Sequence, residues 1–220
     1  MTTARLTKEG IRRLFALLDA DLARAHVHGE IYLVGGAVMC LALDARDATR
    51  DIDAVYRPAQ AVREAAACVA ASAGIPETWL NDAVKGFLSP RGEFTTYLEL
   101  ANLRVYVARP EYILAMKCAA LRLGAAFHDL DDVRFLLRYL NIEKAADALA
   151  IVERYFDASR LGPKTRLALG DCSRGDLRSR SGGLEWEGTP ELEWRPADPR
   201  VRNGVSCAIS TGESADFNRR

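Results

Sequence analysis

The chain has 220 residues, of which 49% are hydrophobic and 27% are charged, and its formal net charge is zero. This composition supports a buried core and excludes a global electrostatic attraction to a polyanion, although it leaves a local basic groove open. The five cysteines lack metal-site spacing, which fits a reducing compartment. The polar N-terminus lacks the apolar core of a signal peptide, and no apolar run is long enough to cross a bilayer. We therefore expect a cytoplasmic protein that does not associate with membranes.

The first half of the chain alternates between helical and strand-like segments. Apolar residues recur at helical spacing or in short runs, and glycine or proline separates several of these segments. Thr7 can cap the first helix. The pattern predicts a helix over residues 7–25, a strand over 31–34, a helix over 37–45, a strand over 51–56 and a helix over 59–73.

The second half begins with a hairpin and then becomes helical. The segments "EFTTYLEL" and "LRVYVA" are rich in β-branched and aromatic residues and flank a turn at Ala101 and Asn102. After Pro110 we expect helices over residues 111–123, 129–140 and 142–156, and a shorter one over 163–169. The fold class predicted from this order is α+β, with a small mixed β-sheet followed by a helical bundle. The tail over residues 170–220 is rich in Gly, Ser, Arg, Glu and Pro, and we expect it to be disordered.

The stretch from Leu33 to Asp53 combines a glycine pair with two aspartates. Gly35 and Gly36 follow an apolar strand and precede a helix, whose first backbone N–H groups are free to bind a phosphate. Glycine has no side chain, so the backbone can approach the phosphate closely. Asp51 and Asp53 are two residues apart on a predicted strand, so their side chains point to one face. Two such carboxylates suit Mg²⁺, which binds one or two carboxylates together with substrate phosphates. The order of these motifs favours phosphoryl or nucleotidyl transfer, although each alone is more often an ordinary turn or a solvated strand edge.

The spacing of Gly35-Gly36 and "TRDID" resembles the signature of the polymerase-β-type nucleotidyltransferase superfamily. Within this superfamily the chain more closely resembles DUF6036-type nucleotidyltransferases, which are related to AbiEii-type toxins. The segments "WLNDAVKGF" and "NLRVYVARPEYILAMKCAALR" are similar to sequences of those proteins. The resemblance covers about residues 5–169 and excludes the tail. It implies a nucleotidyltransferase core over residues 1–109 and a helical domain over 110–169. The superfamily usually has Gly-Ser at the turn; here Gly36 takes the serine position, so backbone groups would hold the triphosphate.

The resemblance also implies a third acid on a neighbouring strand, which binds metal or accepts a proton. Glu99 is the candidate, because it alternates with Leu98 and Leu100, and Glu93 is the fallback; the alternative is a surface glutamate on a hairpin arm. Asp51, Asp53 and Glu99 would then bind two Mg²⁺ ions. Lys117 lies in apolar helical sequence and needs an anionic partner, either a nucleotide phosphate or an acid such as Asp132.

Asp129 and Asp132 are three residues apart on one face of a predicted helix. Acids in a first turn commonly cap a helix, whereas in AbiEii-like relatives a similar motif closes the active site. The resemblance therefore makes Asp129 and Asp132 candidates for nucleotide binding. In this chain His128 occupies the position where those relatives often have a basic residue. Arg50, beside Asp51, could reach a phosphate or pair with an acid.

The resemblance implies transfer of a nucleoside monophosphate from an NTP to a hydroxyl acceptor. AbiEii-like relatives suggest a toxin of a toxin–antitoxin pair with tRNA as acceptor, and minimal nucleotidyltransferases suggest a protein hydroxyl. Lys117 would act with the three acids in catalysis, and a cognate antitoxin or toxin would be the protein partner. The alternative is a catalytically inactive binding module, or an antitoxin-like partner, built on the same fold.

Overall fold

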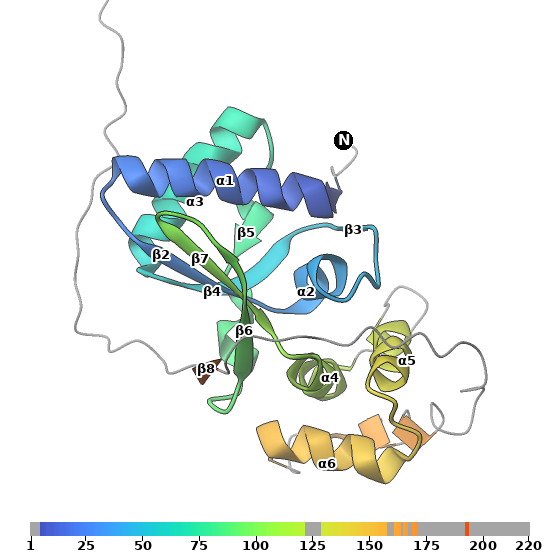
Figure 1. Ribbon diagram of the computed structural model, residues 1–220. Helices are drawn as coiled ribbons and strands as arrows, with labels where there is room; N and C mark the ends of the chain where they lie inside the picture. Colours follow the sequence, from blue (N-terminus) through green and yellow to red (C-terminus); the bar gives the residue numbers. More distant parts are fainter. Residues whose placement is uncertain are drawn as a thin grey trace, which may run out of the picture.

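The structure is a computed structural model that describes residues 5–121, 129–157, 161–163, 165–166 and 169–170, and the backbone of 192–193 (Figure 1). It contains a mixed β-sheet with helices packed around it, which agrees with the α+β class predicted from the sequence. His128 and most of the predicted tail lie outside the described residues. Among the helices described, none combines the length and the apolar character needed to span a bilayer.

The elements of the first half follow the predicted order. Thr7 caps α1, because its side chain accepts a hydrogen bond from the Gly10 N–H at 3.2 Å. Gly74 ends α3 in the left-handed conformation. Helix α2 stops before residue 45, and Asp44 has a positive φ of 49°, which a helix cannot continue through. The elements are β1 (Leu6–Thr7), α1 (Lys8–Arg24), β2 (Gly29–Leu33), α2 (Gly35–Leu41), β3 (Ala48–Thr49), β4 (Ile52–Arg57) and α3 (Ala59–Ala73).

The second half confirms the hairpin and adds short elements that the sequence pattern did not predict. These are η1, β5 and η2 between α3 and the hairpin, and β8, which lies within the predicted tail and pairs with the edge strand β6. The elements are η1 (Glu77–Trp79), β5 (Leu80–Asn81), η2 (Ala83–Phe87), β6 (Glu93–Glu99), β7 (Leu103–Ala108), α4 (Pro110–Ala119), α5 (Asp129–Tyr139), α6 (Ala145–Tyr155) and β8 (Leu192–Glu193).

The larger sheet has the strand order β5-β4-β2-β7-β6-β8 within the described residues. Strand β2 pairs antiparallel with β4 and parallel with β7, and β4 pairs parallel with β5. The ends of β2 and β7 and the start of β4 therefore lie at the same end of the sheet. This end faces α2 and α4, and it positions the candidate site.

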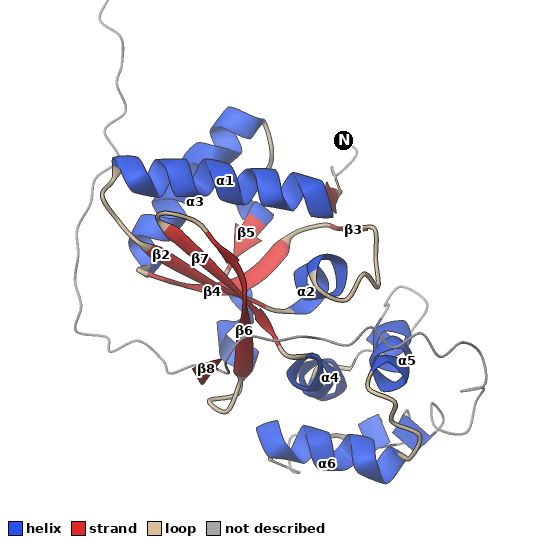
Figure 2. Ribbon diagram, viewed as in Figure 1, coloured by secondary structure: helices blue, strands red, loops and turns tan. Residues whose placement is uncertain are grey.

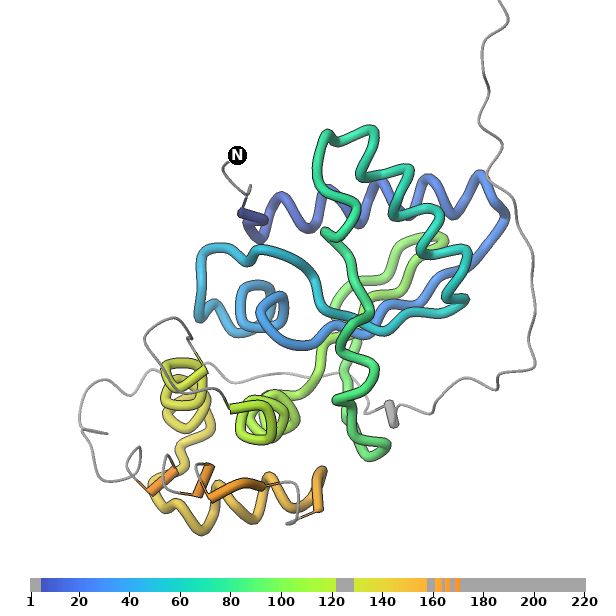
Figure 3. Tube along the Cα trace, turned by 180° about the vertical axis from the view of Figure 1, so that it is seen from behind, coloured from blue at the N-terminus to red at the C-terminus, as the bar shows by residue number. Residues whose placement is uncertain are grey.

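Helices α1 and α3 pack against each other on one face of the sheet, and α4, α5 and α6 form a second group beyond the end of β7 (Figures 2 and 3). Tyr112 of α4 ties the two parts together, because its hydroxyl accepts a hydrogen bond from the Ser89 N–H at 2.9 Å. The Ser89 hydroxyl in turn donates to the Tyr155 carbonyl of α6, and the Tyr155 hydroxyl donates to Glu93 at 3.0 Å. The helices are thus fixed to the start of the hairpin by buried hydrogen bonds.

The turn after β2 requires glycine. Gly35 has a positive φ of 62°, and a side-chain carbon added there would lie 3.0 Å from Oδ2 of Asp53. At Gly36 such an atom would lie 2.7 Å from Oγ1 of Thr49. The sequence pattern predicted that these glycines leave space for a phosphate. In the structure they also leave space for Thr49 and Asp53, which approach them closely.

Alanine at Gly35 tests this close approach. We expect Gly74→Ala to lower the free energy of unfolding by about 1–2 kcal/mol, because its φ of 64° is left-handed but its added Cβ meets nothing within 4 Å. Gly35→Ala carries the same backbone strain and also displaces the Asp53 carboxylate, so its loss should be larger. Urea denaturation of both variants measures the difference. Equal losses would show that Asp53 does not press on the turn.

Candidate functional site

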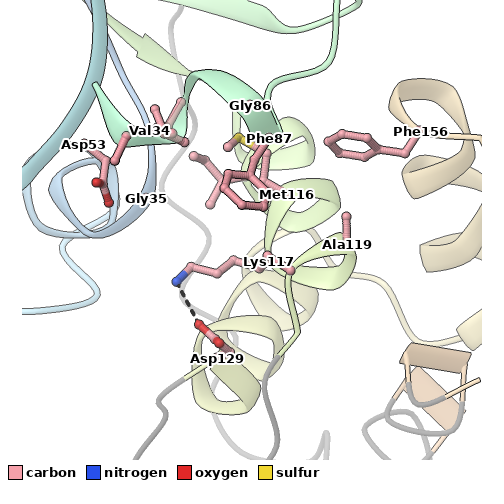
Figure 4. Close-up of a pocket in the computed structure, with 14 residues that line it drawn as sticks. Val34, Gly35, Asp53, Gly86, Phe87, Met116, Lys117, Ala119, Asp129 and Phe156 are labelled. Carbon is pink, nitrogen blue, oxygen red and sulfur yellow. Dashed lines mark hydrogen bonds and ion pairs between the residues drawn. The ribbon is translucent and has the colours of Figure 1, made fainter. Parts of the chain in front are cut away.

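A pocket of about 680 Å³ lies between the end of the sheet and helix α4 (Figure 4). Gly35 and Asp53 form one wall, and Lys117 and Asp129 lie across from them. The rest of the lining is largely apolar and comes from η2, from α4, and from the residues that directly follow β2, α4 and α6. These residues are Val34, Ala83, Val84, Gly86, Phe87, Ile113, Met116, Ala119, Ala120 and Phe156. A volume of this size is typical of small-molecule sites.

Asp53 is the acidic side chain at the sheet end of the pocket. The Val34 N–H donates a hydrogen bond to the Asp53 carbonyl at 3.0 Å, which fixes the start of β4 against the glycine turn. Burial raises the pKa of the Asp53 carboxyl above its ordinary value, and the neighbouring Asp51 carboxylate raises this pKa further. The Asn81 amide and the Lys117 ammonium group lower this pKa. The sequence predicted both aspartates within one strand, whereas in the structure Asp51 precedes β4, is exposed and does not line the pocket.

Lys117 is held by two buried carboxylates. Its Nζ donates to Oδ1 of Asp129 at 3.2 Å and lies 2.9 Å from Oδ2 of Asp132, a close ion pair without hydrogen-bond geometry. Arg46 donates to the other oxygen of Asp132. The i and i+3 spacing of the two aspartates does place them on one face of α5, as predicted. The sequence predicted either a nucleotide phosphate or an acid such as Asp132 as the partner of Lys117, and the structure shows Lys117 paired with two acids.

Glu99 does not join Asp51 and Asp53 in this structure. The strand register aligns Glu99 with Arg104, Arg104 with Glu30, and Glu30 with Arg57, which ends β4. Glu99 therefore lies at the opposite end of the sheet from Asp53, where it forms an exposed ion pair with Arg104 at 3.1 Å. The alternation of residues along β6 predicts which face a side chain occupies, but it does not reveal which end of the sheet it reaches.

The other predicted residues take different positions. Arg50 is exposed in the turn before β4 and does not line the pocket, and Gly36 packs against Thr49 instead of facing the pocket. Asp132 lies behind Asp129 and does not line the pocket itself. His128 lies outside the described residues.

Two residues at the site were missed by sequence reasoning. Asn81 lies opposite Asp53 on the neighbouring strand β5, and its amide lowers the pKa of the Asp53 carboxyl. Its sequence signal was weak: the strands of a βαβ unit are usually adjacent, but the second strand of this unit has only two residues. Arg46 contacts Asp132 from the loop after α2, and no sequence pattern singled it out.

The residues around Asp53 fit a divalent cation in part. Asp51 and Asp53 form a carboxylate pair whose mutual repulsion a cation would relieve, and Mg²⁺ binds such pairs with phosphates and water. Within the described part of the chain, however, no three His, Cys, Asp or Glu side chains converge into a metal-binding group. The two-ion site expected from the sequence depended on Glu99, which lies at the other end of the sheet.

Comparison with known proteins adds no relative: no family model, curated protein or solved structure matches the chain.

Removing the charge of Lys117 tests whether its ion pairs hold the site together. We expect Lys117→Met to lower the free energy of unfolding by about 3–5 kcal/mol, because two buried carboxylates lose a shared cation while the side-chain volume is kept. Chemical denaturation measures this loss. The matched control is Arg104→Met, which breaks the exposed pair with Glu99 and should cost less than about 1 kcal/mol. Similar losses in the two variants would contradict a buried role for Lys117.

The raised pKa of Asp53 predicts a pH dependence of stability. A carboxyl whose pKa is raised on folding stabilises the folded state fully below its ordinary pKa of 3.8, and this contribution is lost as the pH rises through the folded-state value. We therefore expect Asp53→Asn to be more stable than the wild type at pH 7, with the difference shrinking as the pH falls toward 4. Unfolding free energies of both proteins across this range measure the effect. A difference that does not vary with pH would contradict the burial of a charged carboxylate.

Proposed function

We propose that the protein is a Mg²⁺-dependent nucleotidyltransferase that moves a nucleoside monophosphate from an NTP to a hydroxyl acceptor. One observation carries the proposal. Asp53, with Asp51 beside it, and Lys117 lie on opposite walls of a pocket large enough for a nucleotide. A carboxylate on one wall and a cation on the other, with a second carboxylate just outside the pocket, suit a triphosphate that arrives with its metal ion.

Each residue has a role that follows from its position. Asp51 and Asp53 would hold Mg²⁺, which would align the phosphates and neutralise the charge that develops on them. Lys117 would contact a phosphate oxygen while Asp129 and Asp132 keep its ammonium group in place. Gly35 keeps the turn close to Asp53, so a bound phosphate and the carboxylate would share one wall of the pocket. Glu99 has no role in this proposal because of its distant position.

The wider expectations from the resemblance stay proposals. The core over residues 1–109 and the helical domain over 110–169 would meet at the pocket, and the protein would act in the cytoplasm. The acceptor would be an RNA such as tRNA or a protein hydroxyl, and the biological role would be that of a toxin in a toxin–antitoxin pair.

A second candidate is a catalytically inactive module or antitoxin-like partner. The observation that favours it is the charge balance around Lys117, where Arg46 and Lys117 already neutralise Asp129 and Asp132. A lysine whose charge is already paired with two carboxylates binds a phosphate less strongly. Among the described residues, no third carboxylate joins Asp53 in place of Glu99 to form a metal-binding group.

Isothermal titration calorimetry with NTPs separates the two candidates. We expect the wild type to bind NTP in the presence of Mg²⁺, and Asp51→Asn/Asp53→Asn to lose this binding, because the carboxylates hold the ion that bridges to the phosphates. The bound nucleotide would then justify incubation with labelled NTPs and RNA or protein acceptors.

The control is Glu99→Gln, which removes one carboxylate charge at the other end of the sheet and should bind NTP as the wild type does. If a folded wild type binds no NTP with Mg²⁺, the enzyme proposal fails and the inactive module is favoured. If Glu99→Gln loses binding as completely as the double variant, the site lies elsewhere.

A further inference from the structure

Arg46 links the loop that follows α2 to the first turn of α5. Its guanidinium donates to Oδ1 of Asp132. The same side chain lies close to the glycine turn, because a carbon added at Gly36 would be 3.8 Å from its Nη1. Asp132 in turn contacts Lys117 near the end of α4. One carboxylate therefore connects three segments that are far apart in the sequence.

The two oxygens of Asp132 are divided between two cations. Arg46 binds Oδ1, and Oδ2 lies 2.9 Å from the Nζ of Lys117. Lys117 also donates to Asp129 at 3.2 Å, so one ammonium group contacts two carboxylates whose side chains are each 6% exposed. Charges that are removed from water interact strongly, because little solvent screens them. The share of the Lys117 charge that Asp132 takes up therefore depends on the charge that Arg46 supplies.

Only part of this cluster faces the pocket. Lys117 and Asp129 line it, and the Lys117 side chain keeps 18% of its surface exposed. Arg46 and Asp132 are not among the lining residues, so Arg46 reaches a ligand of the pocket through Asp132 and Lys117. These four side chains carry two positive and two negative charges. Without Arg46 the same group would carry one more negative charge than positive charge, which would disfavour an anion in the pocket.

We propose that Arg46 is a positioning residue for anion binding: by pairing with Asp132, it leaves the charge of Lys117 to be shared between Asp129 and a phosphate group in the pocket. This inference rests on the proposed function, because it assigns the phosphate contact to the same lysine. The two carboxylates around Lys117 would otherwise compete with a phosphate for its ammonium group. Arg46 reduces this competition, since it takes over one oxygen of Asp132.

Calorimetric titration of the full chain with inorganic triphosphate in saturating Mg²⁺ tests this role. We expect Arg46→Met to bind triphosphate about tenfold more weakly than the wild type, because one unit charge is lost at a partly buried site. Arg46→Met/Asp132→Asn should regain most of this affinity, because the double variant removes one charge of each sign. If Arg46 merely held its loop in place, removing Asp132 as well would not restore binding. Circular dichroism establishes that each variant is folded.

Two further variants complete the comparison. The matched control is Arg134→Met, which removes an arginine from an exposed pair with Asp131 at 3.4 Å on the same helix and should bind triphosphate as the wild type does. Asp132→Asn keeps the side-chain shape and should bind triphosphate at least as tightly as the wild type, because it removes a carboxylate that competes for Lys117. It tests the inference even if Arg46→Met does not fold.

The inference is overturned if Arg46→Met binds triphosphate as the wild type does, or if the double variant stays as weak as the single one. Weaker binding by Asp132→Asn than by the wild type also overturns it. These results leave the proposed function intact where NTP binding still depends on Asp51 and Asp53. If the wild type binds triphosphate in an Arg46-dependent way but binds no NTP, the proposed enzyme function fails and the anion site stands. If it binds neither, both proposals fail.

Discussion

The site depends on how closely the Asp53 carboxylate approaches the Gly35 turn. Antiparallel pairing of β2 and β4 brings the two segments together, and the Val34 N–H closes the contact by binding the Asp53 carbonyl. Only a residue without a side chain fits at this point, because the backbone is left-handed and the carboxylate occupies the adjoining space. The fold therefore holds the Asp53 carboxyl in a partly buried position, which raises its pKa.

The charges around the pocket form two groups with different consequences. Arg46 and Lys117 balance Asp129 and Asp132, so this buried cluster is close to neutral as a whole. The Asp53 carboxylate is not balanced in the same way, since the cation that lowers its pKa, Lys117, is shared with the cluster. A triphosphate alone would meet repulsion at the carboxylate wall, whereas a triphosphate with a divalent ion would not. Electrostatics thus couples any anionic ligand to a cation.

Where the local sequence signal was strong, it predicted the helices and strands well. The helical spacing of Ile11, Phe15, Leu18 and Leu22 located α1, and the β-branched arms around the turn at Asn102 located the hairpin. The same-face relation of Asp129 and Asp132 also followed from spacing, because a helix repeats regularly.

Long-range relations were harder to predict. Glu99 was assigned to the site from alternation, but the register of β6 with β7 carries it to the far end of the sheet, and that register includes an irregularity between Thr96 and Leu98. Asn81 was overlooked because β5 has only two residues and too little pattern to recognise. Such positions depend on strand pairing between distant segments, which a single sequence does not specify.

The parallel pairing of β2 with β7 also bears on how the chain acquires its structure. Residues 29–33 pair antiparallel with β4, and they pair in parallel with residues 103–107, which lie far along the chain. Contacts of such long sequence separation slow folding, because the loop entropy is lost before the contacts form. During synthesis, β2 and the glycine turn leave the ribosome well before their partner, so an apolar strand edge stays open for that interval. The strand pairing that positions the pocket is thus one of the contacts that slow the folding of the sheet.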